Sequence, residues 1–511
     1  MRLRKRPALS VLALVLVIAT SVVYAAAAAP PGDTPDRPHS QNMHLLGASL
    51  RPGAVIGPPP VGPGDVPWDT RNTDLAFWGK TVIQGRYDGF RVIDIAAPGN
   101  PREQAHFMCV SPQGDVGVYG NLVFRSVDSP QVTDRCSNVA QSGNPTGADC
   151  APATSPCTGF EGIQIFDISD LSDIQLVKSV ALDCGSHTHT VVPDPAKNRV
   201  LIYNSVSGAG LQSNPGKYGN RCPGAPFNRE DIVEVPLANP ASASVIGSFS
   251  LGRMPAPDGR IINTCHDMGV VLGSVKRAAC AGNPGVPVFD ISDLEHPVFL
   301  YATTAPAGPG PGAATVPSWH SAAWSWDGSI LVTGWEPGGG TAPRCMETGT
   351  PISPPIAGFT EQTDEMKTLF FHDGATGEII GRHVMSRSQS QYENCTVHNY
   401  NIVPHPTRKL LVHGSYQSGT ALVDFTDPAN AYEVAWMDPD PLDPPSETSP
   451  GGRTNFRGGD WSSYWYNGLI YESDTRRGLF VWNVSAPEAR GPAVRLDHLN
   501  PQTSHVSLGT N

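Results

Sequence analysis

The sequence predicts an all-β chain that folds as one domain, a seven-bladed β-propeller with four strands in each blade. A strand motif followed by a turn recurs seven times between residues 89 and 489. Two more strand-like segments precede each copy, and the 53 glycines and 50 prolines suit short strands joined by many turns. A pair of packed β-sandwiches is the competing architecture, but seven copies in the same register favour the propeller.

The recurring motif corresponds to the third strand of each blade. Its copies read GFRVIDIAAPGNP, GIQIFDISDLSDI, DIVEVPLANPAS, VPVFDISDLEHP, TLFFHDGATGE, TALVDFTDPANA and GLFVWNVSAPEA. The segment before each copy reads as a hairpin, with turn signals such as Asn467-Gly468 between two strand-like runs. A weaker fourth strand follows, such as VFLYATT after the fourth copy. Each repeat therefore predicts strands A to D of one blade, counted outward from the channel.

The N-terminus has the layout of a secretory signal peptide. Basic residues stand at positions 2, 4, 5 and 6, an apolar run covers 11–23, and alanines follow. A membrane-spanning helix needs about 20 apolar residues, which neither this run nor any later segment supplies. We expect residues 1–29 to be removed and the mature chain to be secreted to the cell exterior, with no insertion into a membrane.

Three further parts follow the signal peptide: an N-terminal segment (30–71), the propeller (72–500) and a C-terminal tail (501–511). The stretch 40–49, SQNMHLLGAS, resembles a fourth strand that has no blade before it. Such a strand completes the last blade and closes the ring, which removes an exposed sheet edge. The segment PAVRLDHL near the C-terminus competes for this place, and we favour the N-terminal strand.

These motifs resemble the LVIVD-repeat family of secreted bacterial proteins. The matching segments are GFRVIDI, GIQIFDISD, VPVFDISD, TALVDFTDP and the leader NMHLLG, within residues 42–485. The resemblance implies a β-propeller at the cell exterior. It implies no defined activity, so the function has to be argued from the residues of this chain.

Charge and cysteine content narrow the classes of partner. Charged residues make up 16% of the chain and the formal net charge is -12, which disfavours nucleic acid and anionic membranes as partners.

Ten cysteines in an oxidising compartment are expected to pair as disulfides. They all fall at connections of one propeller face, which also carries the long B–C insertions 127–160, 206–230 and 336–367. We expect disulfides to staple this face, and Cys265–Cys280 is one pair that the spacing allows.

Histidines recur at the start of the predicted A strands of blades 3 to 6. They are His189, His266, His320 and His398, and His187 stands two residues before His189. Counting 14 residues forward from each of the four reaches the end of strand B, which indicates equivalent positions. Because A strands surround the channel, these imidazoles can converge on one ion, and imidazole is a common ligand of zinc, copper and iron. His187 has no counterpart and is expected to be a spare ligand or a gate.

The sequence offers hydrogen-bond acceptors for these histidines, and it also allows a purely structural role for them. The acceptors that would support such ligands are Asp267, Asn399, Asp183 or Asp194. A histidine at the mouth of an inner strand can equally bond neighbouring blades and channel water, and duplication of a repeat propagates it without any ligand.

Two functions remain open. The first is an extracellular binding module that holds a protein or a small molecule on its disulfide-stapled face. The alternative is a metal-dependent oxidoreductase with copper, iron or zinc at the channel mouth, held by His187, His189, His266, His320 and His398. No nucleophile-elbow or zinc-protease motif occurs in the sequence and no catalytic residue is assigned, which favours the binding module. We expect a monomer.

Overall fold

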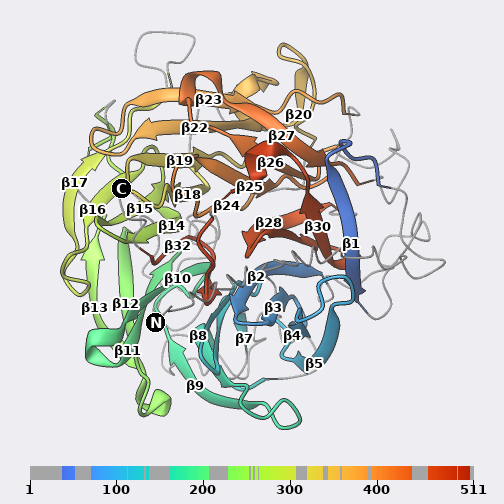
Figure 1. The fold of residues 1–511 in the computed structure, drawn as a ribbon. Helices are drawn as coiled ribbons and strands as arrows, with labels where there is room; N and C mark the ends of the chain where they lie inside the picture. Colours follow the sequence, from blue (N-terminus) through green and yellow to red (C-terminus); the bar gives the residue numbers. More distant parts are fainter. Residues whose placement is uncertain are drawn as a thin grey trace, which may run out of the picture.

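Seven β-sheets form a ring in the computed structural model, about the axis where the sequence predicts the channel, and each sheet forms one blade (Figure 1). The seven-bladed β-propeller predicted from the repeats is therefore confirmed. The structure describes residues 37–51, 71–111, 113–131, 134–136, 160–206, 228–251, 255–256, 259–262, 264–306, 319–337, 343–356, 359–389, 393–439, 459–491 and 493–506. The predicted signal peptide and most of the insertions 127–160 and 206–230 lie outside these residues. Within the described ranges, no helix has the length and apolarity that crossing a membrane requires.

Each blade contains four strands in the order A to D from the channel outward. Blades 1 to 3 consist of β2 (Asn72–Trp78), β3 (Thr81–Arg86), β4 (Gly89–Asp94) and β5 (Arg102–Met108); β6 (Val116–Tyr119), β7 (Leu122–Gln131), β8 (Phe160–Asp167) and β9 (Gln175–Ala181); and β10 (Thr188–Asp194), β11 (Arg199–Ser205), β12 (Arg229–Pro236) and β13 (Ser244–Ser250). Blades 4 and 5 consist of β14 (Cys265–Leu272), β15 (Lys276–Gly282), β16 (Pro287–Asp290) and β17 (Val298–Ala302); and β18 (Ser321–Trp324), β19 (Ile330–Gly334), β22 (Thr368–Asp373) and β23 (Ile379–Val384). Blades 6 and 7 consist of β24 (Tyr400–Ile402), β25 (Leu410–Gly414), β26 (Thr420–Asp424) and β27 (Tyr432–Met437); and β28 (Asp460–Tyr466), β29 (Leu469–Asp474), β30 (Gly478–Val484) and β1 (Met43–Leu50). A small hairpin, β20 (Pro351–Ile356) and β21 (Phe359–Glu361), lies within the insertion of blade 5.

Burial within a blade depends on the distance of the strand from the channel. In blade 1, strands β2 to β4 are buried almost throughout, whereas the outer strand β5 is exposed or half-buried. The middle strands are covered on both faces because the neighbouring blades pack against them. Phe90 of β4, for example, lies against Phe166 of β8, with ring centroids 5.2 Å apart. Apolar contacts between blades therefore make up the core of the ring.

The N-terminal strand closes the ring. β1 pairs antiparallel with β30, from Met43 opposite Val484 to Leu50 opposite Gly478, and Figure 1 shows the blue β1 beside the red β30. The fourth strand of blade 7 thus comes from the other end of the chain. The competing segment PAVRLDHL ends in β31 (His498–Leu499), which instead adds to the inner edge of blade 1 at Phe77 and Trp78.

The C-terminal segment, residues 497–506, lies across the channel at the end where the A strands finish. After β31, strand β32 (Thr503–Ser504) runs parallel to β14 at Val270 and Val271. The Asn500 side chain bonds both the backbone N–H and the carbonyl of Val118 in blade 2, at 2.7 and 2.9 Å. The Thr503 hydroxyl donates to the carbonyl of Val191 in blade 3 at 2.9 Å. One short segment is thereby bonded to the inner strands of several blades, which the repeat pattern did not predict.

Candidate metal centre at the channel mouth

Backbone pairing identifies the equivalent histidines of blades 3, 5 and 6. The N–H groups of His187, His320 and His398 donate to the carbonyl of the last residue of the neighbouring B strand, at 3.0, 2.9 and 2.9 Å. The blade-3 member of the series is therefore His187. The assignment of His189 to this place was wrong, because the hairpin of blade 3 is longer than a fixed count allows and includes the 3-10 turn Pro195–Lys197.

His189 faces blade 2. Its Nδ1 atom lies 2.8 Å from the Ser126 hydroxyl, and its backbone N–H donates to Asp115 Oδ2 at 3.1 Å. Burial lowers the pKa of His189 to about 3, so the ring is neutral. The two histidines of the stretch SHTHT do not share a direction, because only His189 belongs to strand β10 and His187 precedes it. We therefore assign His189 to the contact between blades 2 and 3.

The other four predicted histidines form a continuous series, here called the histidine row: His187, His266, His320 and His398. The Nε2 atoms of His187 and His266 are 2.8 Å apart. Ring centroids are 3.9 Å apart between His266 and His320, and 4.5 Å apart between His320 and His398. The prediction that imidazoles from consecutive blades come together holds for these four residues.

Glu336 joins the histidine row and was missed in the sequence analysis. It follows β19, and its two carboxylate oxygens lie 3.6 Å from His320 Nε2 and 3.8 Å from His398 Nε2. One ligand atom each from His266, His320 and Glu336 lies within 4.8 Å of the other two. Burial raises the pKa of Glu336 to about 7, and the Tyr416 hydroxyl donates to its Oε1 at 2.5 Å. One feature of the sequence could have identified Glu336: it is an acidic residue two positions after the B strand of a blade that carries a histidine.

The Nδ1 atoms of the histidine row all face oxygen acceptors on the protein. The acceptors are Asp128 for His187, Asp267 for His266, the Ser321 hydroxyl for His320 and the carbonyl of Trp461 for His398. The Ser321 hydroxyl donates its own proton to the carbonyl of His398, so its oxygen is left to accept from His320. Protons on Nδ1 of His320 and His398 leave the Nε2 lone pairs of these two rings facing Glu336. This is the arrangement in which proteins orient metal-binding imidazoles. The 2.8 Å contact between the Nε2 atoms of His187 and His266 needs a proton on one of them. Burial by itself lowers the pKa of His187, but Asp128 outweighs it and raises this pKa.

Only one of the four predicted supporting acceptors lies behind the row. Asp267 bonds His266 Nδ1 at 3.0 Å. The other three have different partners: Asp183 pairs with Arg229, Asp194 with Arg199, and Asn399 donates to Asp74. Asp267 also accepts from Gln502 Nε2 at 3.0 Å through its second oxygen, so the C-terminal segment contacts the support of His266 directly.

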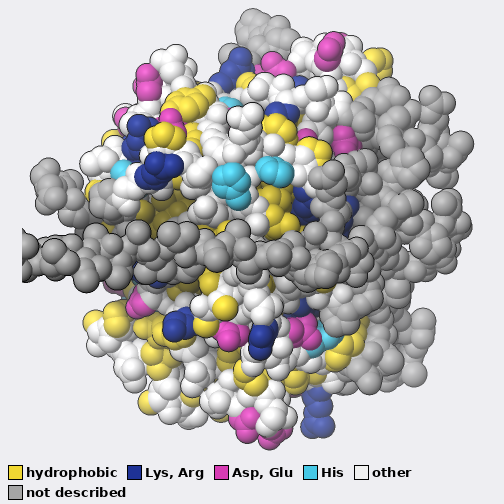
Figure 2. Space-filling view, turned by 45° about the vertical axis from the view of Figure 1, so that its right-hand side comes forward, with side chains coloured by type: hydrophobic (Ala, Val, Ile, Leu, Met, Phe, Trp, Pro, Cys, Tyr) yellow, Lys and Arg dark blue, Asp and Glu magenta, His cyan; other side chains and the backbone are white. Residues whose placement is uncertain are grey.

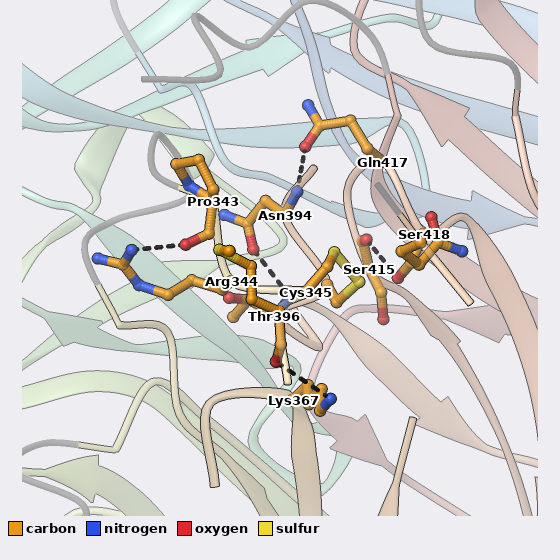
Figure 3. The surroundings of a disulfide bond; sticks show 12 residues. Pro343, Arg344, Cys345, Lys367, Asn394, Thr396, Ser415, Gln417 and Ser418 are labelled. Carbon is orange, nitrogen blue, oxygen red and sulfur yellow. Dashed lines mark hydrogen bonds between the residues drawn. A yellow bond between two sulfur atoms is a disulfide. The ribbon is translucent and has the colours of Figure 1, made fainter. Parts of the chain in front are cut away.

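Disulfides stand beside the loops that carry the histidine row. The structure contains the pairs Cys109–Cys136, Cys265–Cys280 and Cys345–Cys395, and Cys184 is also disulfide-bonded. The pair Cys265–Cys280 confirms the pairing that the spacing allowed. Figure 3 shows the Cys345–Cys395 bridge, where the Asn394 N–H donates to Gln417 Oε1 at 2.9 Å and the Thr396 N–H to Asn394 Oδ1 at 2.8 Å. The segment leading to His398 is thus held by covalent and hydrogen bonds.

Side chains of both charges lie on the face of the molecule that Figure 2 shows. In the view of Figure 2, basic and acidic side chains are interspersed among polar and hydrophobic ones, and histidine side chains reach the surface.

No protein-family model matches the chain, and no curated protein matches it. Solved structures resemble it at low sequence identity. A putative 6-phosphogluconolactonase from Bacteroides fragilis is 10% identical, with a TM-score of 0.41, over 86% of this chain and 98% of that chain. The β-propeller domain of Cps50 (Swd1) from Myceliophteria thermophila is 8% identical, with a TM-score of 0.45, over 81% of this chain and 97% of that chain. The computationally designed protein Ika8 is 12% identical, with a TM-score of 0.37, over 81% and 97%. These values support no inference about activity, and the strand topology itself establishes the seven-bladed propeller.

Proposed function

We propose that the protein is a secreted binding module of the LVIVD-repeat type, and that a divalent transition-metal ion at the channel mouth forms part of its ligand site. The observation that carries this proposal is the common orientation of the histidine row. His266, His320 and His398 are hydrogen-bonded through Nδ1, and His187 Nδ1 lies 3.1 Å from Asp128 Oδ2. The Nε2 atoms of the four rings face one another or Glu336. Disulfides in the described residues support an oxidising, extracellular setting.

The central donor set is His266, His320 and Glu336, with His187 and His398 on either side. Two imidazoles and one carboxylate are donors that iron, zinc and copper accept. Burial lowers the pKa of His266 and of His320, and lowers that of His398 to about 4. These three rings are therefore neutral near pH 7 and offer lone pairs for coordination.

Distances distinguish an ion site from a purely hydrogen-bonded network. The separations of 3.6 and 3.8 Å between Glu336 and the Nε2 atoms of His320 and His398 exceed the usual hydrogen-bond range. Two ligands that each lie about 2.1 Å from one ion are roughly 3.0–3.4 Å apart, so a small adjustment seats a metal between them. The Nε2 atoms of His187 and His266, 2.8 Å apart, are within hydrogen-bond range, so this argument applies to His320, His398 and Glu336.

The binding surface extends from the ion to the loops around it. Disulfide-held loops on a rigid scaffold commonly carry recognition, and Cys265 and Cys395 of two described bridges stand close in sequence to His266 and His398. A protein or a small molecule that offers a carboxylate, imidazole or hydroxyl group would complete the coordination of the ion. The oxidoreductase alternative needs a substrate and an oxidant as well, for which the described residues provide no evidence, so we propose the metal only as part of a binding site.

Metal content tests the proposal. We expect the mature protein, purified without a tag and dialysed, to retain about one transition-metal ion per chain at the channel mouth by mass spectrometry. His266→Ala and Glu336→Gln should lose this ion, whereas His296→Ala, which removes an exposed histidine, should keep it. Substoichiometric metal that neither of the first two substitutions changes would refute the site. Oxygen consumption by the metal-loaded protein would instead support the oxidoreductase.

A further inference from the structure

The C-terminal segment brings together two histidines that are far from the histidine row. His498 lies in β31 at the inner edge of blade 1, and His505 follows β32 at the inner edge of blade 4. Their rings are stacked, with centroids 3.8 Å apart and planes inclined by 15°. The A strands begin near the histidine row and end near this pair, so the two groups of histidines lie at opposite ends of the channel.

Asp497 contributes a third donor to this pair. Its Oδ1 atom lies 2.8 Å from His498 Nδ1 and 3.5 Å from His505 Nε2. One ligand atom from each of the three residues lies within 4.8 Å of the other two. A single carboxylate oxygen thus faces two imidazole nitrogens: the 3.5 Å separation is close to that between two ligands of one ion, whereas 2.8 Å is an ion-pair distance. Because imidazole lone pairs lie in the ring plane, the stacked rings have to turn to converge on an ion.

The three side chains differ in their exposure to solvent. The side chains of His498 and His505 are only 10% and 9% exposed, whereas that of Asp497 is 80% exposed. Trp78 stacks on His498 with ring centroids 4.7 Å apart, and Trp326 lies 5.9 Å from His505. Burial lowers the pKa of both histidines, to about 4 for His505, so both rings are neutral near pH 7. The rings are held from inside while the carboxylate edge stays open to solvent.

We infer that Asp497, His498 and His505 form a second site for a divalent first-row transition-metal ion, such as zinc, with water in the remaining positions. The ion closes the segment between β31 and β32 into a loop. Because this loop is bonded to several blades, the ion holds the segment across the channel. It also fixes Gln502, the residue within the loop that bonds Asp267 behind His266. The two sites share no ligand, so each can be tested in a variant that lacks the other, and Gln502 is the contact that connects them.

Zinc stoichiometry of the full mature chain separates the two sites. We expect two zinc ions per wild-type chain by calorimetric titration and mass spectrometry, and one for Asp497→Asn and His505→Asn. His266→Ala should also bind one, at the C-terminal segment. The exposed pair His296–Asp293, with 3.0 Å between Nδ1 and Oδ2, lacks a third ligand among the described residues and provides the control. His296→Asn should bind two.

Hydrogen exchange gives a second readout of the same inference. Zinc should slow exchange of residues 498–506 at least about tenfold in the wild type and in His266→Ala, but not in Asp497→Asn, whose exposed side chain can be replaced without disturbing the fold. A wild type with one ion that His266→Ala loses and Asp497→Asn keeps would overturn this inference and leave the channel-mouth site intact. One ion that Asp497→Asn loses and His266→Ala keeps would support it and refute the other site.

Discussion

The Nε2 atoms of His187 and His266 lie 2.8 Å apart, so imidazoles from neighbouring blades meet directly at the channel mouth. At this separation the two nitrogens share either a proton or a metal ion. Asp128 and Asp267 stand behind them, on the Nδ1 side of each ring. Through this pair, His187 of blade 3 and His266 of blade 4 join the group that contains Glu336.

The first prediction concerns which of two neighbouring histidines, His187 or His189, contributes to metal binding. His187→Ala should weaken metal binding at the channel mouth at least about tenfold, because its Nε2 adjoins that of His266. His189→Gln should leave the affinity unchanged, since its ring faces Ser126 in blade 2. Calorimetric titration of both variants, in an Asp497→Asn background that removes the second site, measures the difference. Equal loss of affinity in both variants would contradict the assignment.

Gln502 of the C-terminal segment should influence the channel-mouth site through Asp267. Its side chain donates to Asp267 Oδ2 at 3.0 Å, and Asp267 Oδ1 lies 3.0 Å from His266 Nδ1. Gln502→Ala should lower metal affinity about tenfold, which is typical of residues that orient a ligand. Thr503→Val removes a bond of the same segment to Val191 without touching Asp267, so it serves as the matched control. Equal affinities for Gln502→Ala and wild type would show that Asp267 needs no such support.

The Cys345–Cys395 disulfide should matter for both stability and metal binding. Its removal by a double Cys345→Ala/Cys395→Ala substitution should lower the free energy of unfolding by roughly 2–4 kcal/mol. It should also weaken metal binding, because Cys395 stands three residues before His398. Removal of Cys109–Cys136, which joins the connection between blades 1 and 2 to a residue beyond β7, should lower stability but leave the affinity unchanged. Denaturant unfolding and zinc titration of the two double variants test this. Parallel losses of affinity would show that the effect is not local.

Asp88 should make stability depend on pH in the acid range. Arg86 donates to both of its oxygens at 2.6 and 2.7 Å, and His106 Nε2 lies 3.3 Å away. Burial by itself raises the pKa of Asp88, but the bonds from His106 and Arg86 outweigh it and lower the pKa to about 2. A carboxyl whose pKa is lower in the folded state stabilises that state above its unfolded pKa of about 4, and this contribution is lost as the pH falls towards 2.

Asp88→Asn tests the contribution of this carboxylate. The substitution should lower the free energy of unfolding by about 2 kcal/mol at pH 6, and the difference from wild type should shrink as the pH falls from 5 to 2. Denaturant unfolding at several pH values, with the disulfides intact, provides the measurement. A difference that stays constant over this range would show that the charge of Asp88 is not its source.

The fold could be predicted because its information is local and repeated. Motifs such as GFRVID and TALVDF each specify one buried strand, and seven copies specify seven blades. The strand 40–49 could be placed because it has the pattern of an outer strand and no blade of its own. The pairing Cys265–Cys280 was accessible for a similar reason, since both residues belong to one hairpin.

The composition of the site could be predicted only in part. Strand position pointed to His266, His320 and His398, but hairpins of unequal length hid that His187, rather than His189, is their counterpart. Glu336 stands two positions after the B strand of a histidine-bearing blade, but the sequence alone does not show that its side chain turns towards the histidines. Only the approach of blades 5 and 6 brings its oxygens near His320 and His398.

The sequence by itself determined the number of blades, the closing strand and the enrichment of histidine at the inner strands, because these follow from periodicity along the chain. Tertiary structure alone decided which histidines meet and where the C-terminal segment lies. Gln502 and Asp267 are 235 positions apart, and their contact exists only because the closed ring brings the end of the chain back to blade 4. Hydrophobic periodicity specifies strands, whereas contacts across the channel depend on the closure of all seven blades.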